Sequence, residues 1–303
     1  MSVPGSALAT AAPRGGGLAL ALAGAVAFSA KAIVVKLAYR HGVDAVTLLM
    51  YRMLFALPLF AALALWAGRG KPPLTRRDLL AVVGLGFSGY YLASYLDFVG
   101  LQYVSASLER LILYLNPTLV LLLSVLLLGR RVTARQVFAL AVSYLGVLVV
   151  FGHEVEFSGA HSAVGAAFVF ASAASYAVYL VYSGEEVRRL GSVRLTGLAS
   201  SVACLLCIAQ FVLLRPLQAA SVPEPVLWLS LLNATLCTVA PVLMVMMAIE
   251  RIGATRAAQA GMIGPLSTLA LGVMILGEPL NAWIGAGTLL VLLGIWLLAR
   301  ART

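Results

Sequence analysis

Long apolar stretches alternate with short polar breaks along the whole 303-residue chain. Ten of these stretches reach the length of about 20 residues that a helix needs to cross the roughly 30 Å hydrocarbon core of a bilayer. Helices are the expected elements, because a helix satisfies its own backbone hydrogen bonds where water is absent. The predicted spans are 18–39, 45–67, 79–99, 103–128, 134–151, 163–184, 193–214, 226–249, 254–276 and 281–299.

The composition favours a membrane location. Hydrophobic residues make up 62% of the chain and charged residues 11%, and the mean hydropathy is +1.02. A soluble domain has about 45–50% apolar and about 25% charged residues. Lipid is therefore the expected solvent for most of the chain. A cleaved signal peptide is not expected, because the first apolar run exceeds a signal core and contains Lys31 and Lys36.

The basic residues predict how the helices are oriented. The net charge is +10, but the Lys and Arg residues are spread over the short breaks, so no nucleic-acid partner is expected. With both termini cytoplasmic, the outer breaks contain only Arg40 and Arg215, which agrees with the excess of positive charge in cytoplasmic loops. The inner breaks and ends contain Arg14, Arg69, Lys71, Arg76, Arg77, Arg130, Arg131, Arg135, Arg188, Arg189, Arg194, Arg251, Arg256, Arg300 and Arg302.

The two halves of the chain resemble each other. A shift of 148 residues aligns them without a gap, and it places Pro117 on Pro265 and Gly129 on Gly277. Each half has five predicted helices, an odd number, so the second copy must enter the membrane upside down. Inverted repeats of this kind are typical of secondary transporters.

These boundaries divide the chain into four parts. We predict a cytoplasmic tail at 1–17, a first repeat at 18–152, an extracytoplasmic linker at 153–162 and a second repeat at 163–303. The fold class is an all-α integral membrane protein with ten helices in two inverted five-helix repeats. A bacterial-type inner membrane is the expected location.

Each half contains short motifs of its own in a characteristic order. They are Phe28-Ser29-Ala30-Lys31, Asp44-Ala45-Val46-Thr47, Asn116-Pro117, Ala248 to Thr255, Gly264-Pro265 and Gly277-Glu278-Pro279-Leu280. Their order and spacing resemble the drug/metabolite transporter superfamily, in its ten-helix form made of two EamA domains. Two positions depart from that pattern: Phe28, where a Trp-Gly pair is common, and Gly129-Arg130, where Gly-Glu is usual.

The resemblance implies a central cavity between the two inverted halves, alternating access and a substrate site near the bilayer midplane. Within the superfamily it points to bacterial exporters of amino acids and metabolites, including YddG-type exporters of aromatic amino acids. The expected partners are a small solute and lipid. The sequence leaves the oligomeric state open, with a monomer as one option.

Ionisable side chains inside predicted spans are the first candidates for function, because each costs about 3 kcal/mol to place at mid-membrane. They are Lys31, Lys36, Arg52, Asp97, Glu109 and Arg110. One interpretation is structural or gating ion pairs, for example of Arg52 or Lys36 with Glu109 or Asp97. The other interpretation is functional: the four cations outnumber the two carboxylates, so a net positive charge remains in the cavity and can bind a substrate carboxylate. We assign Arg110 to substrate binding and the other five to gating or ion pairs.

Aromatic and polar residues deep in the spans complete the predicted site. The expected substrate contacts besides Arg110 are Tyr91, Tyr95, Tyr114, Tyr176, Tyr179, Gln259 and Met262. Hydrogen bonding between helices is the alternative role for the tyrosines. The matched prolines, Pro117 and Pro265, each free a carbonyl one turn earlier and are candidate hinges. Proline is also simply tolerated in membrane helices.

The chain offers little for enzymatic chemistry. Cys204, Cys207 and Cys237 lie in apolar runs, where a thiol behaves as a small hydrophobe, and the three histidines fall in predicted outer loops. We expect no catalytic residue, cofactor or metal. No G-x-x-x-x-G-K-[ST] loop occurs in the sequence, so direct use of ATP is not expected. The prediction is a secondary exporter of amino acids, including aromatic and apolar ones, with exchange of phosphorylated or other anionic metabolites as the alternative.

Overall fold

The computed structural model describes residues 14–129, 132–158, 160–252, 257, 260–261 and 263–300, and within them the elements are helical. The first half contains α1 (Arg14–Tyr39), α2 (Ala45–Gly68), α3 (Arg76–Leu85), the π-helical turn η1 (Gly86–Leu92), α4 (Ala93–Gly100), α5 (Ala106–Leu113), α6 (Asn116–Leu128) and α7 (Ala134–Ser158). The second half contains α8 (Ala160–Leu190), α9 (Ser192–Leu214), η2 (Leu217–Ala220), α10 (Glu224–Ala234), the π-helical turn η3 (Thr235–Val239), α11 (Ala240–Ile252), α13 (Gly264–Leu271), η4 (Gly272–Leu276) and α14 (Ala282–Arg300).

Nine helical stretches in the described part of the chain are long and apolar enough to cross a membrane. A shorter apolar helix, Gly264–Leu276, occupies the place of the predicted ninth span. Most residues between Ile252 and Gly264 lie outside the described ranges, so a full tenth span stays a prediction.

The helix boundaries repeat at the interval found in the sequence. α3 and α10 begin 148 residues apart, and so do α6 and α13, and α7 and α14. The glycines that end α6 and η4, Gly129 and Gly277, are also paired, and both have left-handed backbone with φ of 63° and 73°. The π-helical turns η1 and η3 fall at matching places as well. The two halves are therefore copies in structure as well as in sequence.

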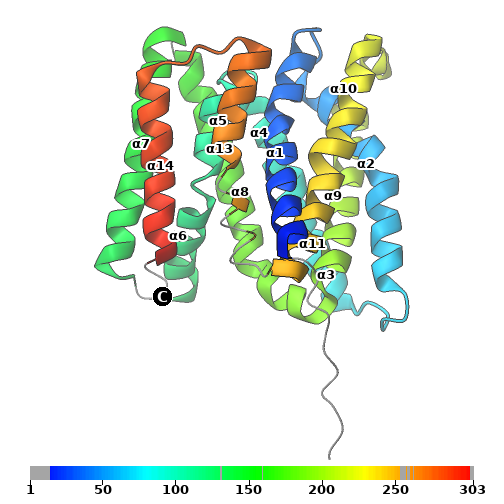
Figure 1. Cartoon of the computed structure of the whole chain (residues 1–303). Coiled ribbons are helices and arrows are strands. Elements are labelled where there is room, and N and C mark those ends of the chain that lie inside the picture. The colour runs from blue at the N-terminus through cyan, green and yellow to red at the C-terminus, as the bar shows by residue number, and fades with distance from the viewer. Residues whose placement is uncertain are drawn as a thin grey trace, which may run out of the picture.

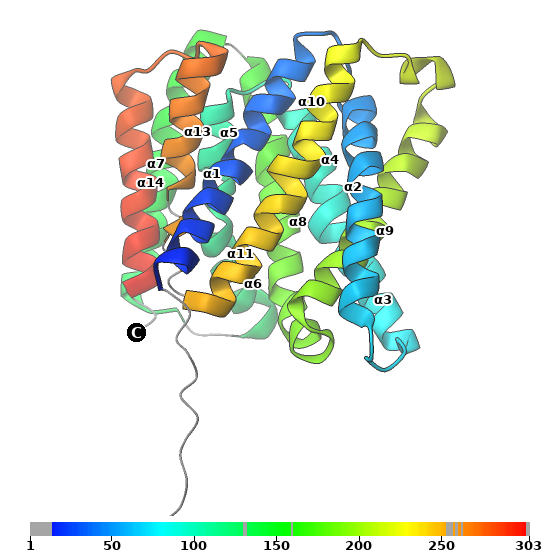
Figure 2. The same ribbon diagram turned by 45° about the vertical axis from the view of Figure 1, so that its right-hand side comes forward.

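The second copy is inverted relative to the first (Figures 1 and 2). α1 begins at the end of the bundle where α14 finishes, which we call the terminal end. α8, the counterpart of α1, begins at the opposite end, which we call the distal end, and runs down toward the terminal end. The described helices of the two halves therefore run in opposite directions through the bundle.

Side-chain caps fix several helix starts. The Asp44 carboxylate accepts hydrogen bonds from the backbone of Val46 and Thr47 at the start of α2. Thr75 and Asp78 form a capping box at the start of α3. Such contacts satisfy N–H groups that the first turn of a helix leaves without a partner.

The predicted linker, 153–162, is helical at every described position, because α7 continues to Ser158 and α8 begins at Ala160. Two polar residues near the end of α7 have partners in segments distant in sequence: Asn281 hydrogen-bonds His153, and Ser105 donates to Glu154. The predicted span 103–128 corresponds to one apolar stretch, Ala106–Leu127, that is long enough to cross a membrane and has a break between α5 and α6.

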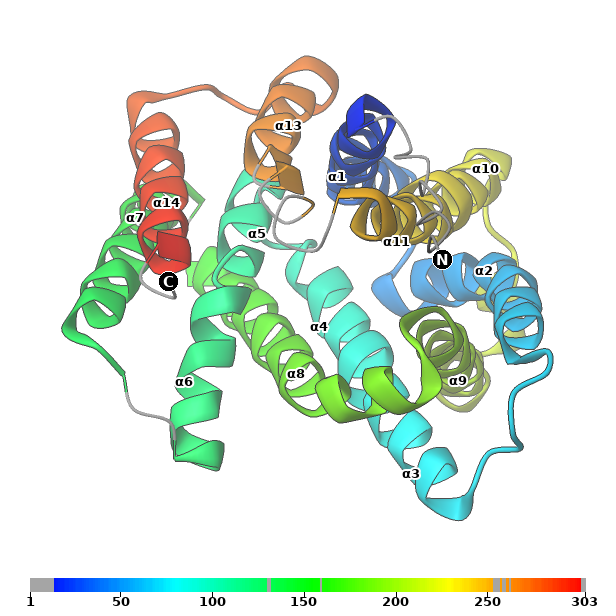
Figure 3. The same ribbon diagram turned by 60° about the horizontal axis from the view of Figure 1, so that its bottom comes forward.

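α7 and α14 lie side by side at one edge of the bundle (Figure 3). Their backbones approach closely at small residues: a Cβ on Gly146 would lie 2.7 Å from the Gly287 carbonyl oxygen, and one on Gly294 would lie 2.1 Å from the Ser143 hydroxyl. Small residues permit such approach between membrane helices.

Gly146→Ala is expected to lower stability by about 1–3 kcal/mol, the usual cost of overpacking. The added methyl group meets backbone atoms of α14, which cannot rotate away. Thermal unfolding in detergent measures the effect, and Gly285→Ala is the matched control because a Cβ there meets nothing within 4 Å. Equal unfolding midpoints for the two variants would show that this contact does not limit stability.

Candidate functional site

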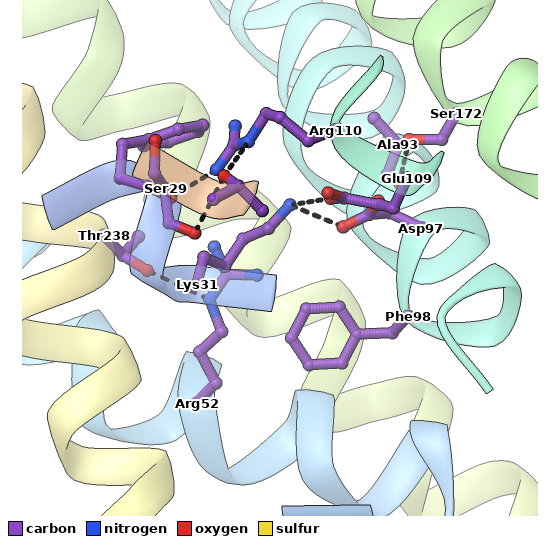
Figure 4. A network of polar contacts seen from close by, with 12 residues as sticks. Ser29, Lys31, Arg52, Ala93, Asp97, Phe98, Glu109, Arg110, Ser172 and Thr238 are labelled. Atoms are coloured by element: carbon purple, nitrogen blue, oxygen red, sulfur yellow. Dashed lines mark hydrogen bonds and ion pairs between the residues drawn. The ribbon is translucent and has the colours of Figure 1, made fainter. Parts of the chain in front are cut away.

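Three charged side chains from the first repeat meet inside the bundle (Figure 4). The Lys31 ammonium of α1 lies 2.6 Å from an Asp97 carboxylate oxygen of α4 and 3.2 Å from a Glu109 oxygen of α5. Their exposed fractions are 6%, 2% and 0%. We call this set the charged triad. Burial at this level requires pairing, since an isolated ion in an apolar interior is strongly disfavoured.

Two arginines lie beside the triad and bridge the two repeats. Arg52 of α2 donates from Nε to the Thr238 hydroxyl in η3 at 3.1 Å. Arg110 of α5 donates from Nε to the Thr268 hydroxyl in α13 at 3.0 Å. Both arginines are at most 5% exposed, and both threonines belong to the second repeat. The guanidinium groups thus use neutral oxygens as partners.

The two guanidinium groups also contact aromatic rings and a backbone carbonyl. Arg52 lies 5.2 Å from the centroid of the Phe98 ring. Arg110 lies 5.4 Å from that of Phe28 and donates to the Phe28 carbonyl at 2.8 Å. Cation–π contact of this kind stabilises a desolvated cation without neutralising it. The positive charge of both groups therefore remains available to an anion.

The ion pairs join members of the set that the sequence assigns to gating or ion pairs. Arg52 and Lys36 were the example partners named for Asp97 and Glu109, and in the structure Lys31 forms the ion pairs with both. Lys36 instead lines a cavity at the distal end. Three oxygens of the triad, Oδ1 of Asp97 and both carboxylate oxygens of Glu109, are buried with no hydrogen-bond partner, although Oε1 of Glu109 is the oxygen that forms the ion pair with Lys31. The triad has a net negative charge and the two arginines are positive. Carboxylate acceptors and guanidinium donors therefore occur in the same part of the bundle (Figure 4).

The matched prolines interrupt their helices at equivalent positions. Pro117 lies in the first turn of α6, and the carbonyl of Leu113 that it leaves free accepts a 2.8 Å hydrogen bond from the Asn116 side chain. Pro265 lies in the first turn of α13, and the corresponding carbonyl is that of Gly261.

The Tyr114 hydroxyl donates to the Gly261 carbonyl at 2.5 Å. Gly264 occupies the place that Asn116 has in the first repeat and carries no side chain that could make this bond. A Cβ on Gly264 would lie 2.0 Å from the Tyr114 oxygen, so the glycine makes room for the phenol. Tyr114 thus connects the helix break of one repeat to that of the other.

The remaining predicted tyrosines do not join this centre as one group. Tyr176 and Tyr179 stack at 5.4 Å and pack with Tyr90, whose hydroxyl lies 3.2 Å from that of Tyr179. Tyr91 and Tyr95 pack against a core formed largely by α1 and α2, which also includes Phe98. The predicted contacts Gln259 and Met262 lie outside the described residues.

Ser29 and Thr268 were missed by the sequence analysis. Ser29 donates to the Gly264 carbonyl at 3.0 Å, next to the Tyr114 contact. Thr268 accepts from Arg110. Small hydroxyl residues are common in membrane helices, so the sequence contains no signal that distinguishes these two from the others.

A cavity of about 590 Å³ opens at the distal end. Its polar lining consists of Lys36, Tyr39, Arg40, Asp44, Gln102 and Glu278. Burial raises the pKa of the Asp44 carboxyl. Hydrogen bonds from Thr47 and Val46 and the charge of Arg215 together lower it by more than burial raises it, so the pKa lies below its ordinary value. Asp44 is therefore ionised at neutral pH, and charges of both signs surround the opening.

Comparison with known proteins decides the family. The model of the EamA-like transporter family matches residues 15–152 and 163–300, one match in each repeat. The chain belongs to the EamA-like transporter family. This protein is therefore an integral membrane transporter of the drug/metabolite transporter superfamily, as its motifs indicated.

Its relatives agree with that assignment. The uncharacterized transporter YcbK of Bacillus subtilis is 33% identical over 269 residues, which cover 86% of this chain and 85% of YcbK. The uncharacterized transporter YyaM of the same organism is 34% identical over 80 residues, 26% of each chain. A solved structure described as "Crystal structure of protein" has a TM-score of 0.60, with 17% identity and coverage of 95% and 96% of the two chains, and so shares the fold.

In the described part of this EamA-like transporter, no group of three or more His, Cys, Asp or Glu side chains is placed to hold a metal ion. Cys204, Cys207 and Cys237 are free thiols and are buried.

Proposed function

We propose that this EamA-like transporter exports zwitterionic amino acids, with large apolar and aromatic ones preferred, from a central site formed by Arg52, Arg110 and the charged triad. The observation that carries the proposal is that two guanidinium groups bound to neutral oxygens occur in the same part of the bundle as three carboxylate oxygens that lack hydrogen-bond partners. An amino acid matches both sets, because its carboxylate accepts from a guanidinium and its ammonium donates to Asp97 and Glu109.

The surroundings favour an apolar side chain on the substrate. The rings of Phe28 and Phe98 lie beside the two arginines, and Tyr114 is on the same helix as Arg110, one turn away. Sites for small molecules commonly combine apolar walls with a few polar groups that fix orientation. Tyr114, Phe28 and Phe98 are therefore the proposed contacts for the side chain of the substrate.

The arginine contacts suggest how binding is coupled to movement. Each arginine comes from the first repeat, and each threonine that accepts from it comes from the second. A substrate carboxylate bound by Arg110 replaces the Thr268 hydroxyl as its acceptor and removes a bond between the repeats. The repeats then rock about the breaks at Pro117 and Pro265, which gives alternating access.

Counterflow in proteoliposomes tests the substrate class. Phenylalanine and leucine are expected to compete with a labelled large apolar amino acid, whereas phenethylamine and phenylpropionate each lack one of the two charged groups and compete at least about tenfold more weakly, the effect of about 1.4 kcal/mol. Equal competition by phenethylamine or by phenylpropionate would contradict recognition of a zwitterion.

Tyr114→Ala is expected to abolish this counterflow, because it removes both the aromatic wall and the hydroxyl bound to Gly261. Tyr182→Ala is the matched control, since Tyr182 is an exposed tyrosine on α8. Counterflow in Tyr114→Ala at the rate of the control would exclude Tyr114 from the site.

A phosphorylated or other anionic metabolite is the second candidate substrate. The triad has one net negative charge and the two arginines have two positive charges, so the centre has a net positive charge. Guanidinium groups bind phosphate well. Competition by sugar phosphates without competition by amino acids in the same assay would favour this candidate.

A further inference from the structure

The start of α5 is bound by two carboxylates that come from other helices. Glu154 of α7 accepts from the Ser105 backbone N–H at 2.6 Å and from its hydroxyl at 2.7 Å. Glu278 accepts from the Ala106 N–H at 2.7 Å, from the Ser107 N–H at 3.3 Å and from the Ser107 hydroxyl at 2.7 Å. Carboxylates at a helix N-terminus form charge-assisted hydrogen bonds and interact favourably with the helix dipole.

Glu278 makes this contact between the two repeats. It follows Gly277 in the connection between η4 and α14 of the second repeat, whereas α5 belongs to the first. Gly272 leaves the required space, because a Cβ there would lie 2.8 Å from a Glu278 carboxylate oxygen. Ala106 and Ser107 are buried, so the bonds are partly shielded from water.

The contact lies between the distal cavity and the central site. Glu278 is part of the lining of the cavity, and the first turn of α5, which it binds, leads directly to Glu109 and Arg110. A solute passing from the centre to the distal end would have to separate α5 from the connection that carries Glu278.

The internal repeat shows that the sequence does not provide this contact at the terminal end. Glu278 corresponds to Arg130, and Glu154 corresponds to Arg302, at the shift of 148 residues. Both arginines lie outside the described residues, so the comparison uses the sequence alone. An arginine accepts no hydrogen bond from a backbone N–H and is unfavourable beside a helix N-terminus.

We propose that Glu278, assisted by Glu154, holds the distal gate of this transporter closed. The carrier therefore rests with its distal side shut and opens there only when the bonds to α5 break. Glu278 is a positioning residue for transport, since it acts on α5 and does not contact the substrate. The proposal rests on membership of a transporter family and is independent of the substrate proposed above.

Thiol labelling tests the gate without any substrate. Ser29→Cys serves as the reporter beside Arg110 (Figure 4), in a background where Cys204, Cys207 and Cys237 are replaced by Ala. A membrane-impermeant maleimide is applied to the distal face of full-length protein in oriented vesicles. Glu278→Gln keeps the size of the side chain but removes its charge, and it is expected to raise the labelling rate at least about tenfold, since it weakens charge-assisted hydrogen bonds.

Controls separate gating from misfolding. Glu224→Gln changes an exposed carboxylate at the start of α10, also at the distal end, and is expected to label at the parent rate. Ser107→Ala removes one of the three bonds to Glu278 and is expected to raise the labelling rate by a smaller factor. If Glu278→Gln does not insert in the membrane, Ser107→Ala becomes the decisive variant. Labelling at the parent rate in the decisive variant would overturn the proposal. Failure of the amino-acid counterflow assay would leave this result unaffected.

Discussion

Lys31→Met is expected to destabilise the protein by about 3–5 kcal/mol, the usual effect of removing one partner from a buried ion pair. Lys31 is the cation that forms ion pairs with both Asp97 and Glu109, and all three side chains are at most 6% exposed. Without the ammonium, two carboxylates face each other in an interior that excludes water. The measurement is the fraction of protein that stays monodisperse in detergent after heating.

Two further variants make this prediction specific. Lys36→Met replaces another lysine of α1. Lys36 is only half-buried and lines the distal cavity, so its replacement should change stability little. Combining Lys31→Met with Asp97→Asn and Glu109→Gln removes all three charges and should restore much of the lost stability while transport stays absent. If Lys31→Met were as stable as Lys36→Met, the triad would not be the central polar contact of the bundle.

Gly264→Ala is the second substitution with a large expected effect. A Cβ at this position would lie 2.0 Å from the Tyr114 oxygen and 3.0 Å from the adjacent ring carbon. The phenol must move, and the Gly261 carbonyl then loses its donor. Overpacking costs about 1–3 kcal/mol and an unsatisfied buried carbonyl about 1–3 kcal/mol, so we expect a loss of several kcal/mol in stability together with loss of counterflow.

The double variant Gly264→Ala with Tyr114→Ala distinguishes the two causes. It removes the clash but leaves the carbonyl without a partner, so its stability should lie between those of Gly264→Ala and the parent. Gly261→Ala is the matched control, since a Cβ there meets nothing within 4 Å. Gly264→Ala behaving like Gly261→Ala in the heating assay would contradict the close contact with Tyr114.

The gate and the central site fit one description of the transport cycle. The repeats are joined at the centre by hydrogen bonds from the Arg52 and Arg110 guanidinium groups to threonine hydroxyls, and at the distal end by the hydrogen bonds that α5 donates to the Glu278 carboxylate. Substrate binding acts on the first set, and opening of the distal side must break the second. A variant such as Glu278→Gln is therefore expected to change the balance of the two access states more than the affinity of the site.

The sequence by itself determined the membrane class, the repeat and the places where helices break. Hydropathy and glycine or proline act locally: an apolar run of sufficient length forms a helix in lipid, and Gly129 and Gly277 end helices because their left-handed backbone suits residues without a Cβ. The shift of 148 residues therefore reappears in the starts of three helix pairs, α3 and α10, α6 and α13, and α7 and α14. The segment at 153–158 escaped prediction because polar residues in it are satisfied by side chains distant in the sequence.

The tertiary structure alone decided which of the candidate residues meet. Hydropathy does not encode how each helix is rotated about its axis, and rotation selects Lys31 as the partner of Asp97 and Glu109. It also separates Tyr176 and Tyr179 from Tyr114, although the sequence places all three deep in their spans. The contact of Glu278 with α5 depends on two segments about 170 residues apart in the chain packing at the same end of the bundle, an arrangement that follows from the inverted repeats and not from any local pattern.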